Sequence, residues 1–200
     1  MFADGYQHIH NIDYSSSVIK QMSTHCDKCS QMKWSVMDCS DLKFNDLSFD
    51  IVLEKATIDA LLTEETNPWD ISLESRAKLG SVLKEVYRVL KSEGQFISIS
   101  FFAPHFRYPL YKSCIDCVQQ NQSSTLRMKA IDELGTNFHY YCYQLIKSGD
   151  KTIELEPKLY EPPKMISGLD INQSRHNSDN NTRDETRGQE KDSYIFDINL

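Results

Sequence analysis

Residues Phe49–Leu62 read FDIVLEKATIDALL, and this segment carries the clearest sign of the fold class. Ile51, Val52 and Leu53 form an unbroken apolar run, which is typical of a strand buried on both faces of a parallel sheet. Thr57 follows closely and can cap a short helix that continues through Leu62. A strand that leads directly into a helix predicts the repeating unit of an α/β protein.

Two further strands are expected upstream of this segment. Ile9–Asp13 has the pattern of a short strand, and the serines at 15–17 then offer hydroxyls that can cap a helix. Lys33–Met37 has the pattern of a second strand, and Asp38 follows it. Both predicted strands therefore end in an acidic residue.

A longer helix is predicted downstream, where apolar residues recur at helical spacing. The residues that keep this period are Leu79, Val82, Leu83, Val86 and Leu90. The sequence KSEG ends the helix, and we expect its Gly94 to adopt a positive φ angle. Strands are expected at 95–101 and at Phe138–Lys147, with a helix at Leu110–Val118 between them.

The pattern predicts one α/β domain over residues 1–148, with a parallel core and an antiparallel edge. Residues 149–193 are expected to form a long loop that is disordered from about residue 172. Asn172–Ser193 contains no aliphatic or aromatic residue, so burial cannot offset the entropy cost of ordering it. The segment 194–200, YIFDINL, is predicted to return to the sheet as a strand antiparallel to Phe138–Lys147.

Composition limits the classes of partner and location. The formal net charge of −7 gives nucleic acid no general electrostatic attraction, so no nucleic-acid partner is expected. No apolar run approaches the ~18 residues of a membrane span, and the N-terminus lacks the layout of a secretory signal. A cytoplasmic protein without a membrane partner is the expectation.

Six cysteines raise the question of a metal site. Cys26 and Cys29 form one CxxC pair, and Cys114 and Cys117 form another. A zinc ribbon normally separates its two pairs by ~15–20 residues, whereas these pairs lie much farther apart. We therefore favour reduced packing cysteines over zinc ligands and predict no metal.

The acids at the two strand ends indicate a chemistry. In parallel α/β sheets, ligands bind beyond the carboxyl ends of the strands. A carboxylate such as Asp13 can accept hydrogen bonds from both hydroxyls of a ribose, and Asp38 can accept one from the exocyclic amine of adenine. The alternative is that each acid is only a turn residue or a helix cap. Two acids at successive strand ends favour a nucleoside site.

Five segments in one order resemble a known family. They are NIDYSSSVIKQM (11–22), WSVMDCSDLKF (34–44), SFDIVLEKATIDALL (48–62), EVYRVLKSEGQFISIS (85–100) and APHFR (103–107). Together they resemble the class I, seven-β-strand S-adenosylmethionine-dependent methyltransferases, and within these the elongation factor 1-alpha lysine methyltransferases. The resemblance implies a Rossmann-like, doubly wound sheet, S-adenosyl-L-methionine as cofactor, and methylation of a protein lysine with elongation factor 1-alpha as the substrate.

The same resemblance implies the residues of a cofactor site. Asp13 would hold the ribose, with Tyr14 beside it, and Asp38 and Cys39 would line the adenine. Lys55 would be a further cofactor-site residue, although a solvated lysine at a strand end is the alternative. No catalytic residue is assigned.

Other residues of these segments have two interpretations each. His105 and Arg107 either border the substrate entrance or serve a structural role in their loop. Tyr140, Tyr141 and Tyr143 either provide an aromatic wall that disfavours a charged lysine substrate or simply pack within their strand.

The family also opens with a strand and a glycine-rich turn, which would precede Met1. The expectation is therefore a truncated domain whose first strand is missing, with low stability and weak cofactor binding. A second interpretation of the whole chain is a non-catalytic, methyltransferase-like protein that binds a protein partner.

Overall fold

The computed structural model describes residues 1–25, 31–118, 124–135, 139–148 and 198–199. Helices and strands alternate through most of these ranges, as the sequence pattern predicts. In chain order the elements are a 3-10 turn at Phe2–Asp4, β1 (Ile9–Asp13), α1 (Ser16–His25), β2 (Lys33–Val36), β3 (Phe49–Lys55), α2 (Thr57–Leu61), α3 (Leu73–Val89), β4 (Leu90–Ser100), α4 (Pro104–Val118), β5 (Thr125–Leu134), β6 (Tyr140–Ser148) and β7 (Ile198–Asn199).

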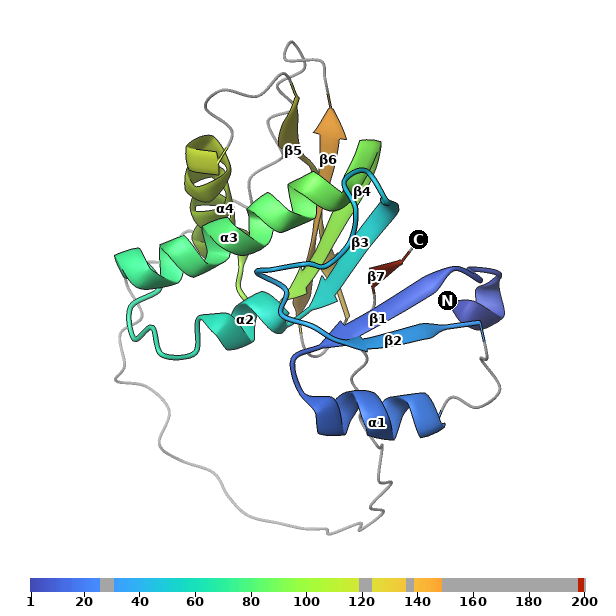
Figure 1. The fold of residues 1–200 in the computed structure, drawn as a ribbon. Coiled ribbons are helices and arrows are strands. Elements are labelled where there is room, and N and C mark those ends of the chain that lie inside the picture. Colours follow the sequence, from blue (N-terminus) through green and yellow to red (C-terminus); the bar gives the residue numbers. More distant parts are fainter. Residues whose placement is uncertain (26–30, 119–123, 136–138, 149–197, 200) are drawn as a thin grey trace, which may run out of the picture. The chain divides into compact units, whose positions relative to one another are not determined.

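The strands form two sheets (Figure 1). One has the order β2-β1-β7 and the other has the order β3-β4-β6-β5. β1 pairs with β2 in parallel and β3 pairs with β4 in parallel, whereas β6 pairs antiparallel with both β4 and β5. The predicted α/β class, with parallel pairing and an antiparallel edge, is confirmed.

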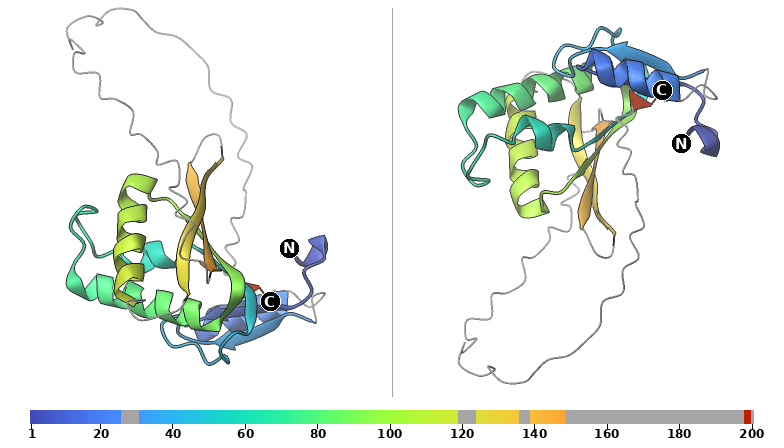
Figure 2. Two further views of the ribbon diagram at one scale, coloured as in Figure 1. Left: turned by 90° about the horizontal axis from the view of Figure 1, so that it is seen from above. Right: turned by 90° about the horizontal axis from the view of Figure 1, so that it is seen from below.

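The helices α3 and α4 lie on one face of the four-stranded sheet (Figure 2). The predicted period is confirmed for Leu79, Val82, Leu83 and Val86, which are buried in α3. The helix ends at Val89, so Leu90, also buried, begins β4 and KSEG lies in that strand. Val52 of β3 and Phe96 of β4 join the α3 residues in the core, each at most 3% exposed. The hydroxyl of Ser72 caps α3 by accepting a hydrogen bond from the Ser75 amide.

The C-terminal strand has a different partner from the one predicted. Ile198–Asn199 pairs antiparallel with Ile9 and His10 of β1, and β7 also lies beside β3. The predicted partner, β6, has no free edge, because β4 occupies one side and β5 the other. The prediction failed because it overlooked β5, whose hairpin with β6 is formed by residues adjacent in the chain. The predicted disorder from residue 172 lies outside the described residues.

Gly94 is also used differently from the prediction. Its φ angle is not in the positive region, and Glu93 adopts a φ of 62° instead. The residues between Leu90 and Gln95 bulge out of the ladder with β3, where the register shifts between Phe49 and Ile51. A Cβ atom at Gly94 would lie 2.9 Å from the Lys91 carbonyl oxygen and 3.1 Å from the Asp50 carbonyl oxygen. Glycine is needed here for close backbone approach rather than for its dihedral freedom.

We expect Gly94→Ala to lower the free energy of unfolding by about 2 kcal/mol, in the range of other overpacking substitutions. The added methyl group would meet backbone atoms, which cannot rotate away. Urea unfolding of the variant would measure the change, with Ser92→Ala as the control because Ser92 is exposed in the same bulge. Equal stability of the two variants would contradict the close approach.

Candidate functional site

Asp13 and Asp38 lie close together at one edge of a sheet. Asp13 is the last residue of β1, and the Met37 amide donates a hydrogen bond of 2.9 Å to its carbonyl oxygen, which brings the end of β2 alongside. Because β1 and β2 run in parallel, their carboxyl ends lie at the same edge. In Figure 1 the carboxyl ends of β1 and β3 come together beside α2.

A cavity of about 460 Å³ opens between these strand ends, α2 and α3, and we call it the strand-tip cavity. Its volume falls in the range of ~300–1,000 Å³ that is typical of small-molecule and cofactor sites. Most of its walls are apolar, with a few polar groups. It is lined by Ile12, Asp13, Tyr14, Met37, Asp38, Cys39, Leu42, Val52, Leu53, Glu54, Thr57, Ile58, Ala60, Leu61, Val82, Val86 and Phe96.

Each strand-end carboxylate uses one oxygen in a turn. Oδ1 of Asp13 accepts a hydrogen bond of 2.7 Å from the Ser15 amide, and Oδ1 of Asp38 accepts bonds from the amide (2.8 Å) and hydroxyl (2.7 Å) of Ser40. These bonds hold the pKa of Asp38 below its usual value. Within the described ranges, Oδ2 of both residues has no hydrogen-bond partner. Each aspartate can therefore hold its turn through Oδ1 and still offer Oδ2 to a ligand.

The other predicted cofactor-site residues differ in position. Tyr14 lines the strand-tip cavity and is 85% exposed. Cys39 also lines it, and burial together with nearby Asp38 raises the pKa of its thiol to about 11, so it stays protonated at neutral pH. Lys55 is not among the described lining residues, and its Nζ lies 5.3 Å from the ring centre of Tyr140. Four of the five predicted cofactor-site residues, Asp13, Tyr14, Asp38 and Cys39, thus line the strand-tip cavity.

Glu54 lines the strand-tip cavity, and the sequence analysis did not assign it. Its Oε2 accepts hydrogen bonds from the amides of Thr57 (2.8 Å) and Ile58 (3.4 Å) at the start of α2. Its Oε1 accepts one from Ser98, whose hydroxyl also lies 2.6 Å from that of Tyr111. Burial raises the pKa of Glu54 to about 7 despite these bonds. The sequence does contain a signal that could have identified Glu54: it is an acidic residue inside an apolar strand, three residues before a helix.

The shifted pKa of Glu54 makes stability depend on pH. The native carboxyl keeps its proton up to about pH 7, whereas an unfolded glutamate loses it near pH ~4.3. The native state therefore binds more protons between these values, and its stability falls as pH rises through this window. Relative to Glu54→Gln, we expect the wild type to lose about 2 kcal/mol between pH 5 and pH 8.

Urea unfolding at several pH values would measure this difference. Glutamine keeps the shape of the side chain and cannot ionise, so it isolates the titration. Glu64→Gln is the matched control because Glu64 is exposed, and its curve should run parallel to that of the wild type. A parallel curve for Glu54→Gln would mean that Glu54 titrates normally.

Arg107 is buried rather than at an open entrance, with its side chain 1% exposed. Its Nη2 forms an ion pair with Asp59 and a 3.3 Å hydrogen bond to Ser100. Arg107 thus lies within α4 rather than in a loop, and its ion pair with Asp59 favours the structural interpretation. Asp59 was left unassigned by the sequence analysis. His105 packs against Phe106, with 4.0 Å between ring centres.

The tyrosines of β6 favour the packing interpretation. Tyr143 is fully buried and donates a hydrogen bond to the Phe102 carbonyl oxygen, and Tyr141 is 9% exposed. Tyr140 alone of the three is partly exposed, and its ring lies 4.2 Å from that of Phe101.

Four of the six cysteines lie in the described residues. Cys39, Cys114, Cys117 and Cys142 are free thiols, and burial raises the pKa of Cys114 and Cys142. Cys26 and Cys29 lie outside the described residues. The described ranges hold no group of three or more potential metal ligands. They also hold no helix with the length and apolar character that crossing a membrane requires.

Comparisons with known proteins found one matching family and several similar sequences. Residues 1–98 match the family described as "Methyltransferase domain". "EEF1A lysine methyltransferase 4" of Bos taurus is 39% identical over 144 residues, which cover 72% of this chain and 54% of that protein. The Mus musculus protein of the same name is 36% identical over 141 residues, which cover 70% of this chain and 52% of that protein.

A solved structure is also similar. The N-methyltransferase NodS from Bradyrhizobium japonicum WM9, in complex with S-adenosyl-l-homocysteine, is 11% identical with a TM-score of 0.48. The match covers 69% of this chain and 65% of that one. The chain spans about half the length of the two curated relatives it matches.

Proposed function

Since residues 1–98 match the methyltransferase-domain family, we propose that the strand-tip cavity binds S-adenosylmethionine and that the protein transfers its methyl group to a lysine of elongation factor 1A. The observation that carries the proposal is the pair of strand-end carboxylates, Asp13 and Asp38, in one cavity. The names of the bovine and mouse relatives support the substrate. Cytoplasmic localisation stays a prediction from the sequence.

The residues of the cavity fit this cofactor. Oδ2 of Asp13 is available to accept hydrogen bonds from ribose hydroxyls, and Oδ2 of Asp38 is available for the adenine amine. Apolar side chains such as Ile12 and Leu42 offer a surface for the flat adenine ring. Tyr14 and Cys39 would flank the nucleoside, and Lys55 would stand beyond the cavity wall.

When bound, the cofactor supplies a methyl group already activated by a positively charged sulfur. The protein then has to position two reactants and exclude water. The apolar walls of the strand-tip cavity would limit the water around bound reactants. Glu54 presents a carboxyl group that gains or loses a proton near neutral pH, so the charge of the cavity wall depends on pH in the working range.

Methyl transfer from labelled S-adenosylmethionine to purified elongation factor 1A tests the proposal. We expect mass spectrometry to find a methylated lysine with the wild type and much less with Asp13→Asn. Asp50→Asn is the control, because Asp50 is an exposed acid that pairs with Lys91 and lines neither cavity. Association with the factor without methyl transfer would instead favour the non-catalytic interpretation. Methylation unaffected by Asp13→Asn would overturn the assignment of the site.

A further inference from the structure

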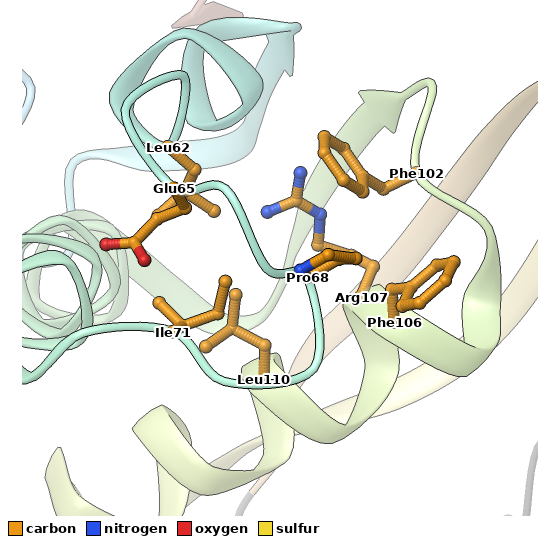
Figure 3. A pocket seen from close by; sticks show the side chains of 8 residues that line it. All are labelled: Leu62, Glu65, Pro68, Ile71, Phe102, Phe106, Arg107 and Leu110. Atoms are coloured by element: carbon orange, nitrogen blue, oxygen red, sulfur yellow. The ribbon is translucent and has the colours of Figure 1, made fainter.

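A second cavity, of about 160 Å³, lies between α4 and the loop that joins α2 to α3 (Figure 3). We call it the Arg107 cavity. Six of its lining residues are apolar, namely Leu62, Pro68, Ile71, Phe102, Phe106 and Leu110, and Glu65 and Arg107 complete the wall. It shares no lining residue with the strand-tip cavity.

Arg107 lines this cavity from within the protein, stacked on the rings of Phe102 and Tyr111, and two of its donors remain unused. Figure 3 shows it extending from α4 toward Leu62 and Phe102. Nη2 is bonded to Asp59 and Ser100, whereas Nε and Nη1 are buried and have no hydrogen-bond partner among the described residues. Buried donors without an acceptor are rare in folded proteins because each costs free energy. This arrangement therefore points to an acceptor that a ligand supplies.

The surrounding charges favour an uncharged acceptor. Asp59 already balances the positive charge of Arg107. Glu54 lies close enough to Asp59 for the negative charge of Asp59 to raise its pKa. Glu65 does not serve Arg107, because its carboxylate accepts hydrogen bonds from the amide and hydroxyl of Ser72 at the start of α3. A further anion would be repelled by these acids, whereas a carbonyl oxygen would satisfy the donors without adding charge.

Size and surroundings favour a polypeptide as the source of that carbonyl. The volume is close to the ~150 Å³ of an apolar cavity that holds one benzene molecule, and it is too small for a cofactor. Two exposed aromatic rings adjoin it. Phe102 lines the cavity, and Trp69, 69% exposed, packs edge-to-face on Phe106 with 4.6 Å between ring centres. Exposed aromatic side chains are enriched where proteins bind one another.

We propose that the Arg107 cavity is a docking site for the polypeptide substrate. It receives one apolar side chain, and the adjoining main-chain carbonyl oxygen accepts hydrogen bonds from Nε and Nη1 of Arg107. The inference rests on the proposed function only for the identity of the partner. The site recognises sequence near the target lysine, outside the part of the enzyme that holds the methyl donor.

Nuclear magnetic resonance of the full chain, labelled with ¹⁵N-arginine, tests this site without a methyl donor. The probes are N-acetyl-leucine-N′-methylamide, benzene and acetate. We expect the leucine amide to shift the Nε–H signal of Arg107 and to bind about 10-fold more tightly than benzene, which lacks an acceptor. Acetate should cause no saturable shift.

Two variants locate the binding. Arg107→Lys keeps a cation for Asp59 but removes the fork of donors, so it should weaken the leucine amide about 10-fold and leave benzene unchanged. Leu110→Phe should fill the cavity and weaken both. Saturable acetate binding would indicate an anion site, equal affinity for benzene and the leucine amide would indicate a purely apolar cavity, and no binding would indicate that water satisfies Arg107. Each of these three results would overturn the proposal while leaving the methyl-transfer assay to judge the proposed function.

Discussion

Asp13→Asn is expected to weaken binding of S-adenosylmethionine about 30-fold, because hydrogen bonds to a charged acceptor are worth ~1.5–3 kcal/mol. The amide oxygen of asparagine can still accept the 2.7 Å bond from the Ser15 amide. Its amino group, however, replaces Oδ2, which is the oxygen available for the ribose. The substitution therefore removes a ligand acceptor and keeps the turn at the end of β1.

Isothermal titration calorimetry with S-adenosylmethionine would measure this loss. Asp38→Asn should also weaken binding, but less, because adenine offers a single amine donor where the ribose offers two hydroxyls. Asp50→Asn again serves as the control with an exposed acid. If Asp13→Asn bound the cofactor as tightly as the control, the nucleoside assignment of the strand-tip cavity would be wrong.

Asp59→Asn is expected to lower the free energy of unfolding by about 3–5 kcal/mol, as is usual when one partner of a buried ion pair is removed. The Arg107 guanidinium would then be a buried charge without a counterion. Asp59 also accepts hydrogen bonds from the Ser100 hydroxyl (2.6 Å) and the Phe101 amide (3.0 Å). These two bonds go to different oxygens, Oδ1 and Oδ2, so asparagine, which has a single oxygen, loses one of them.

Thermal and urea unfolding would measure this effect, which corresponds to a fall in Tm of about 10 °C for a domain of this size. Adding Arg107→Met should recover part of the loss, since it removes the uncompensated charge. Asp50→Asn is the matched control, because Asp50 pairs with Lys91 at the surface and should cost less than ~1 kcal/mol. A loss of similar size in both aspartate variants would refute the special role of the buried pair.

The local sequence pattern was enough to predict the strands and the helix that surround the strand-tip cavity. The strand and helix of Phe49–Leu62 were predicted from an apolar run and a following cap, and β3 and α2 confirm the two elements. The predicted cap, Thr57, is wrong: Ala56 is the N-cap residue, and the Glu54 carboxylate accepts the hydrogen bonds of the first amides of α2. The positions of Asp13 and Asp38 also followed from the local pattern. Parallel strands bring their carboxyl ends to one edge, so two strand-end acids in sequence become neighbours in space.

The local sequence pattern did not predict which distant segments pair with one another. The antiparallel partner of β7 was predicted wrongly, because β5 was missed and it takes the edge of β6. The positive φ angle lies at Glu93 rather than at Gly94. Glycine is needed at position 94 because a Cβ atom there would crowd backbone atoms, in part those of Asp50 on another strand, and this contact is not visible in the sequence. The pairing of Asp59 with Arg107 joins residues 48 positions apart, and each looks like an ordinary charged residue on its own.

The amino-acid order thus carries whatever depends on neighbours along the chain: which segments become strands and helices, and which acids end the strands. Side-chain periodicity and capping act over a few residues, so a single sequence reveals them. Folding in three dimensions added the raised pKa of Glu54 and the unused donors of Arg107, because desolvation and hydrogen-bond satisfaction depend on which distant groups surround a side chain.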